Sequence, residues 1–271
     1  MGILIGFKLY FLLYQLFVMK KISLLLCFSF TLGIGLGNSQ TKSNERLIYA
    51  ASYNMSGLMT QLAQVTMRTE TIKTTKKSFL HLSWEASTFS KWDSFFKIRD
   101  VYESYVDPST LKPSLYKRSI SEGAYSKTEK YIFGANGRSI NSTTQKKNRP
   151  ATMKTMAIGS SSQDIISMIY KLRRINFSQF KPNQSTSFMI IFDEKEYPVY
   201  VKYMGLETVS AGNLGKMQCF KISIAAKTDK LKGKDKNLIW LTADAKKIPA
   251  LIRFSIPVGT GQLSLANASG I

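Results

Sequence analysis

Apolar side chains recur at every second position through most of residues 45–270. In residues 79–88, for example, Leu80, Leu82 and Trp84 share one face, while polar side chains alternate with them on the other. This period is that of a β-strand with one buried face, and repeated strands separated by turn residues are typical of antiparallel sheets. We therefore predict a mainly β protein built from long hairpins.

A single helix interrupts the strand pattern at about residues 161–174. Ser161 and Asp164 have the spacing of a capping box, and apolar residues at helical spacing follow. We predict a strongly curved antiparallel sheet, or half-barrel, that encloses this central helix. A plain β-sandwich is the alternative.

The first 39 residues read as a signal peptide. From Met19, a short basic segment leads into an apolar run and then into small residues that end near Ser39. We expect translation to start at Met19, and the protein to be exported to the periplasm or associated with the outer membrane. The alternative is an uncleaved membrane anchor, although each apolar stretch is short for a span.

Residues 45–271 read as a single β domain. Within it, residues 134–160 are rich in Asn, Ser, Thr, Gly and Lys, a composition that predicts a flexible connection. Residues 105–113 and 241–249 each run from a strand through an Asp-initiated turn into Pro and a further strand. They are either two ordinary hairpins or the trace of an internal duplication.

The formal net charge is +21, and three lysines but no acids lie in the first 39 residues, so +18 remains on the mature part. Such a charge favours anionic partners. For an exported protein these are acidic lipid headgroups or acidic glycans, and not nucleic acid. A generally basic surface without a dedicated ligand is the simpler interpretation. Cys219 is the one cysteine of the mature part, and we expect it to be buried and inert.

No catalytic centre stands out, and we predict no catalytic residue, metal or cofactor. His81 is the only histidine, and we interpret it as a hydrogen-bonded structural residue. Asp100, Glu103 and Asp107 form an acidic cluster, but Asp107 precedes Pro108 and is typical of a turn cap. A hydrolase would require two of these carboxyl groups to face one cleft.

Aromatic residues on the predicted strands are the candidate ligand-binding residues. If they line the concave side of the sheet, they form a platform for acyl chains or sugar rings. Ordinary core packing is the competing interpretation. The candidates are Trp84, Tyr102, Tyr105, Tyr125, Tyr131, Tyr197, Tyr203 and Trp240.

Residues 95–113, 164–173 and 239–253, in this order, resemble the DUF3108 family of exported bacterial proteins of the Bacteroidota type. The resemblance implies a periplasmic or outer-membrane-associated β protein and brings no catalytic residues with it. The strand–Asp–turn–Pro–strand units are also similar, at the level of fold, to periplasmic lipoprotein carriers, which cover helices with a curved sheet.

Three functions follow as hypotheses. The first is a non-enzymatic envelope protein that binds a lipid or another amphipathic ligand in its curved sheet, with peripheral membrane association. The second is a structural or assembly factor that acts by contact with an envelope protein. The third is a glycan or lipid hydrolase that uses acids near residues 100–107.

Overall fold

The computed structural model describes residues 43–55, 57–226, 237–256 and 259–271. These residues form one 15-stranded sheet and few helices. The signal-peptide prediction for residues 1–39 lies outside the described residues, and so does the lysine-rich stretch of residues 227–236. Within the described part, no helix is both long and apolar enough to span a bilayer.

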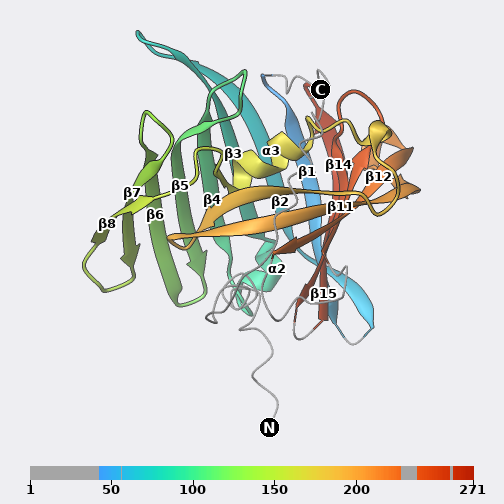
Figure 1. The fold of residues 1–271 in the computed structure, drawn as a ribbon. Coiled ribbons are helices and arrows are strands. Elements are labelled where there is room, and N and C mark those ends of the chain that lie inside the picture. The colour runs from blue at the N-terminus through green and yellow to red at the C-terminus, as the bar shows by residue number, and fades with distance from the viewer. Residues whose placement is uncertain (1–42, 56, 227–236, 257–258) are drawn as a thin grey trace, which may run out of the picture.

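The sheet consists of two meandering halves that join at its centre (Figure 1). Strand β1 pairs with β15, and from this pair the strands run outward, in sequence order to β8 on one side and in reverse order to β9 on the other. The first half contains β1 (Arg46–Met55), β2 (Leu58–Lys73), β3 (Ser78–Thr88), β4 (Arg99–Val106), β5 (Pro113–Glu122), β6 (Tyr125–Phe133), β7 (Ser139–Lys146) and β8 (Thr152–Ala157). The second half contains β9 (Gln163–Asp164), β10 (Ser185–Phe192), β11 (Lys195–Ser210), β12 (Lys216–Ala226), β13 (Asn237–Thr242), β14 (Pro249–Ile256) and β15 (Gly259–Ser269).

The sheet is strongly curved but not closed, which confirms the predicted half-barrel. All named pairs are antiparallel except the short pairing of β9 with β10. Strands β10 and β11 cross in front of the first half, and the turn between them reaches β5 and β6 (Figure 1). The halves therefore meet twice, through the backbone pairing of β1 with β15 and through side-chain contacts at the β10–β11 turn.

The central helix is shorter than predicted. Helix α3 spans Ile165–Leu172, and Asp164 caps its N-terminus by accepting hydrogen bonds from the backbone of Ile166 and Ser167. Ser167 completes a capping box by accepting from the backbone N–H of Asp164. The box thus begins three residues later than the sequence indicated, because Gln163 and Asp164 first pair with β10 as strand β9.

The predicted flexible connection at about residues 134–160 contains two strands, β7 and β8, and the prediction is wrong there. Ile140 and Ser142 of β7 are buried, whereas almost every residue of β8 is exposed. An edge strand that is solvated on both faces has no apolar alternation, so its composition is that of a loop. Its threonines nevertheless suit the extended backbone.

The core consists of three apolar clusters that all contact Trp84. Met168 and Leu172 of α3 pack against β10–β13, while Ile166 and Tyr170 pack against the first half. A short helix α2 (Ser90–Asp93) and two helical turns, η1 (Phe177–Gln179) and η2 (Gly212–Leu214), lie in the connections. Helix α3 therefore fills the space between the halves.

A buried ion pair fixes α3 to the start of β1. Arg173 is the C-cap of α3, and its two terminal nitrogens, Nη1 and Nη2, donate to the carboxylate of Glu45 at 2.7 and 2.6 Å. Both side chains are almost fully buried. The pair is bidentate, the geometry in which a buried ion pair is best compensated for lost hydration.

Candidate functional site

The candidate site lies where the β10–β11 turn meets the inner face of β5–β8. Asp193 and Glu194 form this two-residue turn, and both have positive φ values, 46° and 57°. Two-residue hairpins favour this left-handed backbone because it matches the twist of the strands. The turn therefore presents two carboxylates to the first half of the sheet.

Asp193 enters a buried ionic cluster with Arg118, Lys127 and Glu129. Lys127 Nζ lies 2.8 Å from Asp193 and 2.5 Å from Glu129, and Arg118 contacts both carboxylates, at 2.6 Å from Glu129. Burial raises the pKa of Glu129, against the influence of both cations. Burial also opposes ionisation of Asp193, but Arg118 and Lys127 hold its pKa below the usual value. The two cations thus neutralise the two acids.

Glu194 fixes the other side of the turn. Its carboxylate accepts hydrogen bonds from the hydroxyl groups of Ser142 and Thr144, the latter at 2.9 Å. Its backbone N–H donates to the phenolic oxygen of Tyr131 at 3.1 Å. The turn is therefore held by strands β6 and β7 as well as by the ionic cluster.

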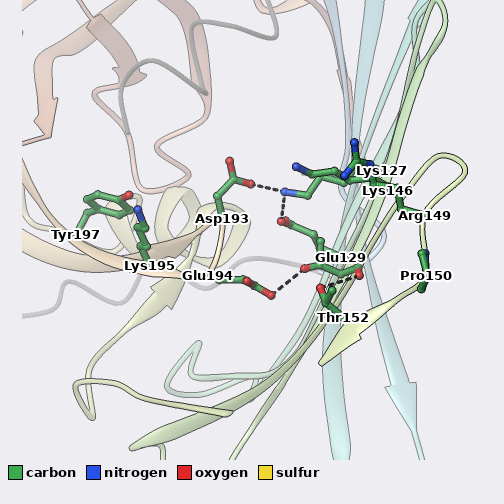
Figure 2. Close-up of a pocket in the computed structure, with 11 residues that line it drawn as sticks. Lys127, Glu129, Lys146, Arg149, Pro150, Thr152, Asp193, Glu194, Lys195 and Tyr197 are labelled. Atoms are coloured by element: carbon green, nitrogen blue, oxygen red, sulfur yellow. Dashed lines mark hydrogen bonds and ion pairs between the residues drawn. The ribbon is translucent and has the colours of Figure 1, made fainter. Parts of the chain in front are cut away.

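A pocket of about 410 Å³ opens beside this turn (Figure 2). Lys127, Lys146 and Arg149 form one wall, and Lys195 and Tyr197 lie on the opposite side. Its volume is within the range of small-molecule sites.

The charges of the pocket are unequal. Lys146, Arg149 and Lys195 form no ion pair with a carboxylate of the described residues, whereas Glu194 is the one lining acid outside the neutralised cluster. Thr144 and Thr152 add hydroxyl groups to the lining. The arrangement can hold an anionic group such as a phosphate or a carboxylate.

The predicted aromatic platform is not assembled on one surface. Tyr131, Tyr203 and Trp240 are buried in three different core clusters, and Trp84 packs where the clusters meet. Of the eight candidates, Tyr197 alone lines the pocket.

The remaining tyrosines are also separated. Tyr102 packs against the core cluster of the first half, and Tyr125 is partly buried at the start of β6. Tyr105 lies on the other face of β4, where its ring stacks on His81 with 4.4 Å between centroids. Core packing thus accounts for more of these residues than a ligand platform does.

The acidic cluster of residues 100–107 is divided in the same way. Glu103 hydrogen-bonds with His81 Nε2 at 3.0 Å, so this histidine is a structural, hydrogen-bonded residue. Asp107 caps its turn by accepting from the backbone of Ser109 and Thr110, and hydrogen bonding to these residues lowers its pKa to about 2. The two carboxylates thus have separate structural partners.

The structure instead pairs Asp100 with Glu122, which the sequence did not indicate. Burial and the neighbouring charge of Asp100 raise the pKa of Glu122 to about 8. Burial raises the pKa of Asp100 to about 6, although it accepts a hydrogen bond from the backbone of Ser121 at 2.9 Å. Glu122 precedes a glycine and resembles an ordinary hairpin residue, so its sequence neighbours do not indicate this interaction.

Cys219 is buried, and burial raises the pKa of its thiol to about 11. This agrees with the inert cysteine that we predicted. In the described part of the chain, His, Cys, Asp and Glu side chains do not gather in threes as a metal site would require.

The fold and the site together define a barrel-like open sheet with a basic pocket. A family model for proteins of unknown function, DUF3108, matches residues 49–266, and the chain belongs to this family. The fold is similar to that of a beta-barrel-like protein of the domain of unknown function DUF1849 from Brucella abortus. The TM-score is 0.56 at 9% identity, over 84% of this chain and 97% of the other. No curated protein matches the sequence.

Proposed function

We propose that this is a non-enzymatic binding protein of the bacterial envelope, which holds the anionic headgroup of an amphipathic ligand in the pocket beside the β10–β11 turn. The observation that carries the proposal is the set of three cations, Lys146, Arg149 and Lys195, around a pocket whose inner acids already have cationic partners.

The arrangement favours an anion over a cation. Glu194 is the one lining acid without a cationic partner among the described residues, and a cation beside it would be repelled by the three unpaired cations of the pocket. An anion needs only to replace water on side chains that already face the pocket. The high positive charge of the mature chain would also increase the rate at which an anion arrives.

The ligand's headgroup, and not its hydrocarbon, is the part that fits. The inner face of the sheet is filled by the three core clusters and by α3, and the pocket is lined mainly by charged and hydroxyl-bearing residues. Acyl chains would therefore remain outside the half-barrel. The envelope location is supported by the signal-peptide pattern of residues 19–39.

Calorimetric titration of the purified protein with dihexanoyl phosphatidylglycerol tests this proposal, with dihexanoyl phosphatidylcholine as the neutral comparison. We expect binding of the anionic lipid only. Each charge-assisted contact contributes about 1.5–3 kcal/mol, so the double variant Lys146→Ala/Arg149→Ala should bind at least about tenfold more weakly.

The matched control is Lys73→Ala/Lys76→Ala, which removes the same charge from the opposite end of the sheet. Its affinity should equal that of the parent protein at the same ionic strength. Equal losses in both variants would indicate non-specific attraction, and an unchanged affinity in the pocket variant would overturn the proposal.

One observation favours a second candidate, an assembly factor. Among the described strands, β8 ends the sheet without a further neighbour, and Met153 on it is 82% exposed. A free edge can pair with a strand of another protein. A photo-crosslinking residue at position 153 should then capture one stoichiometric envelope protein, whereas the same residue at Thr128, on interior strand β6, should not.

A further inference from the structure

Apolar side chains gather at one end of the sheet, in the turns that follow β1 and β3. Because neighbouring strands are antiparallel, the β1–β2, β3–β4, β5–β6 and β7–β8 turns all lie at this end (Figure 1). We call the side chains of Leu58, Met59, Trp92 and Phe95 the apolar rim. Leu58 and Met59 begin β2, and Trp92 and Phe95 belong to α2 and the loop after it.

Three of the four rim side chains are exposed, and Trp92 is half-buried. Leu58 is 75% exposed, Phe95 is 69% exposed and Met59 is 43% exposed. At the opposite end of the sheet, Ile132 near the end of β6 is 46% exposed, and no other large apolar side chain in or beside the described turns there reaches this degree. Exposed apolar groups that concentrate at one place on a protein mark a contact surface.

The loop that carries the rim is held in place. The indole N–H of Trp92 donates to the carbonyl oxygen of Gln61 at 3.0 Å. The backbone N–H of Phe89 donates to the carbonyl oxygen of Leu62, also at 3.0 Å. These bonds fix α2 against Gln61 and Leu62 of β2. The loop that carries Trp92 and Phe95 is therefore held at the same end of the sheet as Leu58 and Met59.

Cations surround the rim. Lys91 Nζ lies 5.8 Å from the centre of the Trp92 ring, and Lys97 follows Phe95 on the same loop. Asp93 is the one acid of this loop, and Arg99 pairs with it at 2.5 Å. The turn after β7 adds Lys147, which is exposed at the same end. The rim is thus apolar at its tips and positive at its base.

We propose that the apolar rim is a docking surface for an anionic lipid bilayer. Trp and Phe side chains on loop tips reach the depth of the headgroups and the first methylene groups, while lysines around them contact acidic headgroups. A protein partner would need a surface whose shape complements the spaces between these side chains. A bilayer accommodates separate projecting side chains without such a shape. This inference does not depend on the pocket described above.

Sedimentation with lipid vesicles tests the inference. We expect the purified protein to bind vesicles of phosphatidylglycerol and phosphatidylcholine in equal parts, and to be released by salt. The double variant Leu58→Ser/Phe95→Ser should partition at least about tenfold more weakly, because two apolar side chains no longer leave water. The variant Lys91→Ala/Lys97→Ala should lose about fivefold for each cation.

The matched control is Ile132→Ser/Leu206→Ser, which removes two exposed apolar side chains from strands away from the rim. It should bind vesicles like the parent protein, and thermal unfolding should show that all variants fold. Vesicles with brominated acyl chains should quench tryptophan emission in the parent protein, and the variant Trp92→Phe should lose most of that quenching.

Equal binding by the rim variant and the parent protein would overturn the inference. Quenching of tryptophan emission that persists in Trp92→Phe would also overturn the inference. An equal loss of vesicle binding in the control variant would do the same. If vesicles bind neither protein while Leu58→Ser/Phe95→Ser abolishes crosslinking to an envelope protein, the rim is a protein-docking surface and the bilayer proposal fails. The rim variant leaves every pocket residue in place, so its outcome is separate from that of the headgroup titration.

Discussion

Raising the pH from about 5 to about 9 should weaken the folded state through one carboxyl group, that of Glu122. Its usual pKa is 4.5, and in the folded protein burial and the charge of Asp100 raise it to about 8. Between these two values the folded protein keeps a proton that the unfolded chain has released. Folding is therefore favoured most below the lower value, and the advantage is lost as the pH rises through the higher one.

The size of the effect follows from the shift. One pKa unit corresponds to about 1.36 kcal/mol, so the full shift sets an upper limit of about 5 kcal/mol. Glu122 is partly exposed, and water reduces the interaction, so we expect about 2–3 kcal/mol. Asp100, with a pKa raised to about 6, contributes in the same direction at lower pH.

The variant Glu122→Gln isolates this contribution, because the amide keeps the shape and can still donate a hydrogen bond to Asp100. Urea unfolding at several pH values should show that the free energy of unfolding of the variant increases relative to that of the parent as the pH rises, by about 2–3 kcal/mol near pH 9. Glu70→Gln, at an exposed position of β2, is the control and should show no such trend. Parallel stability curves for Glu122→Gln and the parent would refute the reasoning.

Three further predictions concern stability and reactivity. Trp84→Ala should cost about 3–5 kcal/mol in urea unfolding, because the indole contacts all three core clusters; a loss under about 1 kcal/mol would show that the clusters are independent. Glu45→Gln should lower the free energy of unfolding by about 3–5 kcal/mol, because it leaves the buried Arg173 unpaired. The double variant Glu45→Gln/Arg173→Met should recover much of this loss, and no recovery would mean that the packing of the pair matters more than its charge. Cys219 should react with iodoacetamide only under denaturing conditions, since its thiol is buried with a pKa of about 11, and fast labelling of the folded protein would contradict the packing.

The sequence predicted the sheet because alternation is a local property. Leu80 and Leu82 alternate with polar neighbours, and the structure buries both on one face of β3. The prediction failed at β8, where no face is buried and the pattern therefore carries no signal. It also placed the capping box too early, because the pairing of Gln163 with Ile190 cannot be read from neighbouring residues.

The candidate site was less accessible to prediction because its parts are distant in sequence. Arg118 and Asp193 lie 75 residues apart and meet only because the sheet curves. The insertion of the Asp193–Glu194 turn against β5 and β6 could not be predicted from the residues near it in sequence. Aromatic residues on strands indicated a platform, yet the burial of Tyr131 and Trp240 depends on which face each strand turns inward.

The pairing of β1 with β15 has a consequence for how the chain is made. The seam at the middle of the sheet joins Arg46 to Ser269, so a nascent chain that lacks its final strand has two incomplete halves and not a trimmed sheet. Strand β1 of one half and strand β14 of the other would then each expose an unpaired backbone edge at the middle of the sheet. Completion of the sheet must therefore wait until β15 has emerged.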